Sequence, residues 1–295
     1  MNLKQIALDT VQALDRGTYH APGGDIVDFA ADLASCVAGT RCYSPDDLEA
    51  LQEQVLSQLA LHATTVFELV NETTLMGAAR LVRSGKYRGV CALNFASAKN
   101  PGGGFLGGAQ AQEESLARSS GLYTSLLECR GYDSYHRAQH TSMYSDRMIY
   151  SPACPVLRTD DGQWLKAHYL VDILTSAAPN AGAIAKNEPH NLVRIPAVLH
   201  ARTGKMLALA VKQGCEALIL GAWGCGAFRN DPELVASIFW EYLNPNGPYW
   251  GRFHTVLFSV LDTSRTQSIY SAFARRFGPL LSSGSSGAEV KKAEG

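Results

Sequence analysis

The sequence carries almost no net charge and has no long hydrophobic run. Its 295 residues hold 26 Lys and Arg against 27 Asp and Glu, for a formal net charge of −1 at pH 7. This balance lacks the positive field typical of nucleic-acid-binding proteins, so we expect no sequence-specific nucleic-acid binding. No stretch reaches the ~18 apolar residues of a membrane-spanning helix, and the N-terminal segment lacks the apolar run of a signal peptide. We therefore expect a cytoplasmic protein without a membrane partner.

Paired cysteines and the common metal motifs are also missing. The seven cysteines form no CxxC pair, and their odd number and apolar surroundings indicate reduced, mostly buried thiols. His136 and His140 are four residues apart, but no third ligand pattern such as HExxH accompanies them. We therefore expect no metal and no cofactor, and both histidines are expected in a solvated loop. A P-loop motif, GxxxxGK, is absent as well.

The densest chemical signal is a glycine run followed by two acids. Five of the seven residues over 102–108 are glycine, which predicts a backbone that bends sharply against a flat or charged ligand. Gln112, Glu113 and Glu114 follow, and leucines then recur at helical spacing. The carboxylates therefore lie in the first turn of a helix over 112–129, where free N–H groups stabilise anions. Ordinary first-turn acids would explain the pair alone, but the adjacent glycines favour a site.

A second glycine loop, GAWGCGAF over residues 221–228, lies between an apolar run and a helix that opens at Asp231. Successive backbone amides in such a loop form an anion-binding nest, although a tight turn without ligand explains the glycines about as well. Their spacing is not GxGxxG, which disfavours a nicotinamide-dependent oxidoreductase. Cys225 has no His or Lys nearby in the sequence to activate it, which argues against a nucleophile.

Strands and helices alternate from residue 64 onward, which predicts an α/β core with a mixed, largely parallel sheet. Both glycine loops follow strand ends, the edge at which open α/β sheets bind ligands. Capping boxes are expected at Ser44 and at Ser264. The expected strands are 64–70, 89–96, 148–150, 152–158, 163–165, 168–178, 216–220 and 253–261. The expected helices are 1–16, 44–59, 74–84, 112–129, 191–213, 231–243 and 264–277. A hairpin is expected at 18–29 and a polar loop at 132–148.

Composition and domain-size priors suggest a division of the chain. Residues 1–60 are expected to form an N-terminal helical extension packed on the core. Residues 61–281 are expected to form the catalytic core. The small, polar residues over 282–295 are expected to be a disordered tail.

The glycines at 102–104, followed after seven residues by Gln112, Glu113 and Glu114, resemble the signature of poly(ADP-ribose) glycohydrolases of the compact bacterial type. These enzymes are macrodomain proteins, and residues 221–228 are similar to the family's diphosphate loop. The resemblance implies a macrodomain-like three-layer α/β/α fold. It also implies hydrolysis of ribose–ribose O-glycosidic bonds in poly(ADP-ribose), exo-acting, with release of ADP-ribose.

The resemblance further implies the roles of the site residues. Glu114 would protonate the leaving oxygen and then serve as base for water, while Glu113 would orient the ribose through its hydroxyls. The implied substrate-binding residues are Gln112, Asn100, Gly102, Gly103, Gly104, Phe105, Gly224, Cys225, Gly226, Ala227 and Phe228. Poly(ADP-ribose) or ADP-ribosylated proteins would be the substrates, and ADP-ribose the product, with no metal or cofactor.

Two other functions stay open for such a fold. A macrodomain that binds ADP-ribose without hydrolysis is disfavoured by the Glu113–Glu114 pair, because a simple binder needs no acid there. A hydrolase that removes mono-ADP-ribose from protein or nucleic acid is not distinguished by the sequence. Lys99 and Arg118 flank the signature, and phosphate neutralisation and ordinary surface charge explain them equally well.

Overall fold

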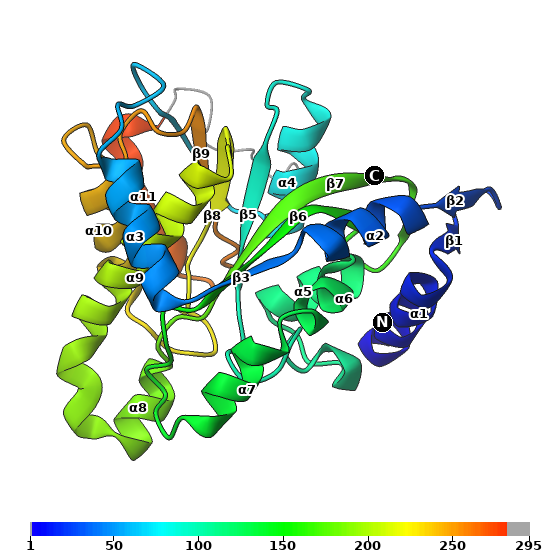
Figure 1. The fold of residues 1–295 in the computed structure, drawn as a ribbon, viewed down its shortest axis with the longest axis horizontal. Coiled ribbons are helices and arrows are strands. Elements are labelled where there is room, and N and C mark those ends of the chain that lie inside the picture. The colour runs from blue at the N-terminus through cyan, green and yellow to red at the C-terminus, as the bar shows by residue number, and fades with distance from the viewer. Residues whose placement is uncertain (1, 282–295) are drawn as a thin grey trace.

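A mixed sheet forms the centre of the computed structural model, which describes residues 2–281 (Figure 1). In spatial order its strands are β3 (Arg41–Tyr43), β6 (Met148–Arg158), β7 (Trp164–Ser176), β5 (Val90–Phe95), β8 (Ala217–Leu220), β9 (Thr255–Ser259) and β4 (Val66–Val70). The strands from β7 to β4 run parallel, whereas β6 is antiparallel to both of its neighbours. The predicted mixed, largely parallel sheet is therefore confirmed.

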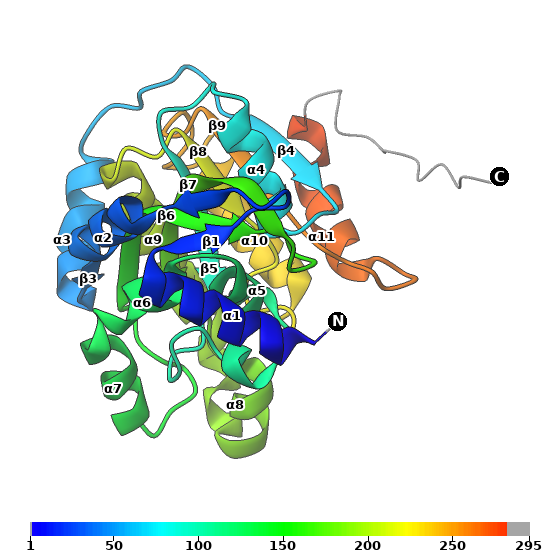
Figure 2. The ribbon, with the colours of Figure 1, turned by 90° about the vertical axis from the view of Figure 1, so that its right-hand side faces the viewer.

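Helices cover both faces of this sheet, which gives the predicted α/β/α layers (Figures 1 and 2). One face carries α3 (Pro45–Leu56), α9 (Ile195–Lys212), α10 (Pro232–Leu243) and α11 (Ser268–Phe277). The other carries α2 (Ala30–Gly39), α4 (Thr74–Arg83), α5 (Gln112–Ser119), α6 (Leu122–Leu127) and α7 (Arg130–Ala138). The remaining elements are α1 (Leu3–Arg16), β1 (Thr18–His20), β2 (Ile26–Asp28), η1 (Phe105–Gly107), α8 (Ala181–Asn187), η2 (Pro189–Arg194) and η3 (Gly278–Leu280).

The N-terminal segment supplies an edge strand as well as helices. The sequence predicts neither β3 nor α2, yet β3 pairs with the first residues of β6 and α2 packs on the same strand. The capping box of α3 is confirmed, because Ser44 Oγ accepts from the Asp47 N–H and Asp47 Oδ2 accepts from the Ser44 N–H. The division at residue 60 stays a prediction, and the predicted tail over 282–295 lies outside the described residues.

The predicted continuous helix over 112–129 is wrong, because the chain breaks between α5 and α6. Ser120 is extended, with φ −147° and ψ 176°, and forms an antiparallel bridge with Val156. The Gly121 N–H then donates to Pro155 O at 2.9 Å. Pairing with β6 therefore takes the backbone out of the helix for two residues. The polar loop predicted over 132–148 is also wrong at its start, where α7 is helical.

The helix α11 begins without the predicted capping box at Ser264. Gln267, the residue before the helix, has a left-handed conformation and caps nothing with its side chain. Asp262 takes the role instead, since its Oδ2 accepts from the N–H groups of Ile269 and Tyr270 at 2.8 and 3.2 Å. A carboxylate at this position satisfies the free N–H groups of the first turn as a local cap does.

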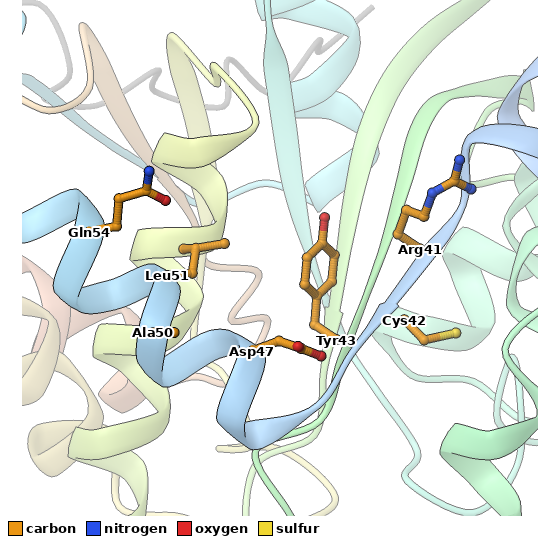
Figure 3. Close-up of a pocket in the computed structure, with 7 residues that line it drawn as sticks. All are labelled: Arg41, Cys42, Tyr43, Asp47, Ala50, Leu51 and Gln54. Atoms are coloured by element: carbon orange, nitrogen blue, oxygen red, sulfur yellow. The ribbon is translucent and has the colours of Figure 1, made fainter.

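Reduced thiols are predicted throughout, and this prediction is wrong at two positions. Cys42 of β3 and Cys129, just before α7, form a disulfide with Cα atoms 5.9 Å apart. A shallow groove of about 400 Å³ lies between β3 and α3, and Figure 3 shows the Cys42 side chain pointing away from α3. The other five cysteines are buried thiols.

Within residues 2–281, no helix combines the length and hydropathy that a membrane span requires. The cytoplasmic location stays a prediction.

Candidate active site

A cavity of about 690 Å³ opens at the carboxyl ends of the parallel strands. Residues that follow four of these strands line it: Glu72 after β4, Ser97 after β5, Gly224 after β8 and Val260 after β9. Because the ends of parallel strands meet at one sheet edge, segments far apart in the sequence converge there. The first turn of α5 and the loop over 224–228 therefore share this cavity.

Glu113 is the buried member of the acid pair. Its side chain is 3% exposed. Its Oε1 accepts from Asn94 Nδ2 at 3.2 Å and its Oε2 accepts from the Ser97 N–H at 2.6 Å. Burial, with a smaller contribution from the nearby charge of Glu114, raises the pKa of Glu113 to about 8 against the lowering effect of the hydrogen-bond donors. This carboxyl is consequently fixed in place and easily protonated.

Replacing Glu113 by Gln should remove a pH-dependent loss of stability in the ligand-free protein. Burial holds the folded-state pKa at about 8, above the ordinary value of 4.5. The stability contribution of such a group is complete below the unfolded pKa and disappears as pH rises through the folded pKa. The free energy of unfolding should therefore fall between these values, relative to Glu113→Gln, by an amount on the order of a few kcal/mol. Urea unfolding at several pH values measures this, and parallel pH curves for the two proteins would contradict it.

Glu114 is held by the glycine run. Its Oε1 accepts from the Gly104 N–H at 3.0 Å, and its side chain is half-buried at the cavity wall. Gly103 has φ 61°, and a Cβ at this position would collide with the carboxyl group of Glu114. The left-handed region favours glycine, which lets the backbone lie directly against the acid. The glycine run therefore shapes the seat of Glu114.

Gln112 joins three elements beside the two acids. Its Oε1 accepts from the Phe95 N–H at 2.8 Å. Its Nε2 donates to Leu93 O at 2.8 Å and to Thr74 Oγ1 at 3.1 Å. These bonds attach the start of α5 to the end of β5 and to α4. The amide thus fixes the direction in which Glu113 and Glu114 enter the cavity.

The loop over 224–228 presents unpaired backbone donors. The N–H groups of Gly226, Ala227 and Phe228 donate to no acceptor within residues 2–281, and Gly226 and Ala227 are exposed. Three consecutive free N–H groups form an anion-binding concavity. Asn230, 3% exposed, anchors the loop, since its Nδ2 donates to Pro179 O at 2.8 Å and Gly224 O at 3.1 Å.

Some residues expected at the site lie elsewhere. Asn100 is exposed and lies outside the cavity wall, where its carbonyl accepts from the Gly103 N–H. Phe105 is 1% exposed and packs on Tyr123, with ring centroids 4.8 Å apart. Its buried ring therefore anchors the glycine run to the protein interior. Cys225 is buried beneath its loop, and burial raises the pKa of its thiol to about 12, which excludes a thiolate nucleophile at neutral pH.

The structure also brings in Asp160, which the sequence does not single out for the site, beside Arg118, which flanks the signature. Asp160, in the turn between β6 and β7, accepts hydrogen bonds from Thr73 and from Ser115, the residue after Glu114. Arg118, one turn further along α5, is 5% exposed and lines the same part of the cavity. No local sequence signal identifies Asp160, because its partners come from two distant helices.

Within the described part of the chain, no group of three or more His, Cys, Asp or Glu side chains is placed to hold a metal ion.

The comparisons with known proteins point to one family. The family model for "Microbial-type PARG, catalytic domain" matches residues 7–159. No curated protein matches the chain.

The solved structures that resemble this chain belong to the same family. The chain is similar to poly(ADP-ribose) glycohydrolase (PARG) from Thermomonospora curvata, with 47% identity and a TM-score of 0.89 over 93% of this chain and 99% of that chain. The structure of that enzyme bound to the inhibitor ADP-HPD gives 46% identity and a TM-score of 0.87 over the same shares. The enzyme from Deinococcus radiodurans in complex with ADP-ribose gives 44% identity and a TM-score of 0.79 over 84% of this chain and 98% of that chain.

Proposed function

The chain belongs to the microbial-type poly(ADP-ribose) glycohydrolase family, and we propose that it cleaves the ribose–ribose O-glycosidic bonds of poly(ADP-ribose) with Glu114 as the acid. The protein is a glycosidase with a macrodomain-like fold. The observation that carries the assignment of residues is the shared cavity: Glu113, Glu114 and the loop over 224–228 line it together, although more than a hundred residues separate them. One cavity therefore offers an acid and a phosphate site.

Glu114 suits the role of general acid. One of its oxygens is held by the Gly104 N–H, and the other has no hydrogen-bond partner among residues 2–281. As the bond between the ribose C1 and the bridging oxygen breaks, the electron pair moves onto that oxygen, which takes the proton of Glu114 and leaves an oxocarbenium-like carbon. The resulting carboxylate accepts a proton from the water that attacks C1, and the acid is restored.

Glu113 suits the role of ribose holder. Its two oxygens accept one hydrogen bond each from the protein, and a carboxyl group, whether protonated or ionised, has further hydrogen-bonding positions. The remaining positions are available to sugar hydroxyls. Because Asn94 and Ser97 fix the carboxyl group, it presents a rigid acceptor, and a rigid acceptor sets the position of C1 relative to Glu114.

The diphosphate is assigned to the loop over 224–228. The free N–H groups of Gly226, Ala227 and Phe228 supply donors without a bulky side chain between them and the ligand. The glycines at 102–104, which the resemblance also implies for substrate binding, are assigned a different task. The Gly103 and Gly104 N–H groups donate to Asn100 O and to Glu114, so they are already used inside the protein.

Attack at chain ends fits the position of α1. Leu3 lines the cavity beside Arg118, and Thr10 Oγ1 of the same helix donates to Arg118 O at 2.7 Å. Ala7 packs with Phe105 and the neighbouring residues of α5. The helix is thus fixed at one side of the cavity, and we propose that it blocks the continuation of a polymer on that side. A terminal unit needs one exit for the chain, whereas an internal unit needs two.

Incubating the purified protein with labelled poly(ADP-ribose) of defined length tests this function. Single ADP-ribose units should form from the first time points, as resolved by chromatography. Short internal fragments among the early products would contradict attack at chain ends. Release of ADP-ribose from a mono-modified protein, with the polymer left intact, would indicate a mono-ADP-ribosyl hydrolase. Tight binding of ADP-ribose without any product would indicate a binding macrodomain.

A further inference from the structure

His136 is a buried histidine of α7 that the proposed mechanism does not use. The sequence predicts a solvated loop here, and this prediction is wrong, because the side chain is 0% exposed. The carbonyl of Tyr132 lies 2.7 Å from Nδ1. A carbonyl only accepts, so Nδ1 carries the hydrogen and Nε2 is an acceptor. Nε2 accepts from the N–H and the hydroxyl of Ser145 at 3.1 and 2.8 Å, and burial lowers the pKa of His136 to about 4, which keeps the ring neutral.

Ser145 belongs to the loop over 139–147, which surrounding side chains hold at several points. Within this loop Tyr144 has φ 58°, in the left-handed region. This conformation is strained for a non-glycine residue and persists only where the surroundings impose it, most often at functional sites. The other contacts that hold the loop run from Glu188 to Thr141 and Ser142, and from Arg202 to Met143 and Asp146.

Tyr144 connects this loop to the cavity. Its ring centroid lies 5.8 Å from that of His136 and 6.0 Å from that of Phe228, which lines the cavity. Tyr144 also packs on a small apolar cluster of Ala96, Ala98 and Ala177, next to the ends of β5 and β7. A line of ring contacts therefore runs from α7 to Phe228. The family resemblance implies that Phe228 binds substrate, and we assign its ring to the ribose beside the cleaved bond.

We propose that His136 is a positioning residue: it fixes Ser145 and the strained Tyr144, whose ring holds Phe228 against the ribose at the cleaved bond. The inference rests on the proposed function, since Phe228 has a reacting sugar to position only if the polymer is cleaved. Without the Nε2 acceptor, Tyr144 relaxes towards ordinary φ values and Phe228 loses its support. A displacement of about 1 Å at the reacting centre costs roughly 100-fold in rate.

The variant His136→Phe keeps a buried ring and removes the acceptor for Ser145. We expect kcat on poly(ADP-ribose) to fall roughly 10- to 100-fold. The Kd for ADP-ribose should change little, because the variant displaces the ring of Phe228 and leaves the backbone N–H groups of residues 226–228 in place. His136→Gln restores both a donor and an acceptor and should recover most of this loss. His140→Phe makes the same change at an exposed histidine and should behave as wild type.

Fluorine NMR separates this inference from the function on which it rests. With para-fluorophenylalanine incorporated and the Phe228 signal assigned through Phe228→Leu, the signal should shift in His136→Phe and stay in place in His140→Phe. A wild-type protein that cleaves no polymer ends the proposed function, while the NMR comparison still decides whether His136 controls Phe228. An unchanged Phe228 signal overturns the inference. Equal losses of kcat and of Tm in His136→Phe and His136→Gln also overturn it, because they indicate a structural histidine only.

Discussion

Glu114→Gln should bind ADP-ribose with nearly the wild-type Kd and lose about 10²- to 10⁴-fold in kcat. Glutamine keeps the shape of the side chain, and its amide oxygen can still accept from the Gly104 N–H that holds Oε1. It has no proton to give to the leaving oxygen, and it cannot take one from the attacking water. The loss therefore falls on the chemical steps, while the ribose and diphosphate contacts remain.

Turnover of purified polymer and calorimetric titration with ADP-ribose measure the two quantities separately. Glu128→Gln, the same change at an exposed glutamate of the next helical segment, is the matched control and should keep wild-type kcat. A wild-type rate in Glu114→Gln would remove this residue as the acid and leave Glu113, with its pKa raised to about 8 by burial, as the group to test next. Loss of ADP-ribose binding with unchanged folding would assign Glu114 to binding instead.

Gly103→Ala should lower kcat about 100-fold without unfolding the protein. The backbone at Gly103 has φ 61°, and a Cβ there would collide with Oε1 and Cδ of Glu114. The acid must then move from the position that the Gly104 N–H sets. The left-handed conformation of an alanine costs only about 1–2 kcal/mol in a surface loop, so the effect on Tm should stay small.

Gly107→Ala is the control within the same glycine run. A Cβ at Gly107 meets no atom within 4 Å, and the residue does not have a positive φ. Both variants are compared by kcat, KM and Tm. If Gly103→Ala turns over polymer like the control, the glycine run does not position Glu114, and its conformation serves the fold alone.

The parts of the site that lie close together in sequence could be predicted from it. The glycine run and the acids of α5 are neighbours in the chain, and turn chemistry and helical spacing are local signals. The contacts that complete the site are not local. Glu113 receives its donors from the end of β5, and Ser115 is bound to Asp160 across 45 residues. Only the folded sheet edge brings such partners together.

Elements with a strong apolar pattern could be predicted from the sequence. Elements whose buried side chains are polar could not. The strands β5 and β8 are apolar runs and lie where the sequence predicts them. The helix α7 escaped prediction because its buried positions are Tyr132, Asp133 and His136, which look like the residues of a solvated loop. The strand β3 has only three residues, and its partner in β6 lies about a hundred positions away, beyond the reach of any local pattern.

Main-chain amides, and not a cluster of cations, make up the anion site that we propose over 226–228, and this has a consequence for how the site can vary. An exposed side chain such as that of Ala227 can be replaced without the loss of a backbone N–H donor. Anion binding is lost only when the backbone of the loop is displaced. A substitution at Gly224 would do this, because a Cβ there would collide with Ala178 and Asn230. Peptide dipoles carry no net charge, so their attraction acts at short range and depends little on ionic strength. A chain with a formal net charge of −1 can in this way hold a polyanion.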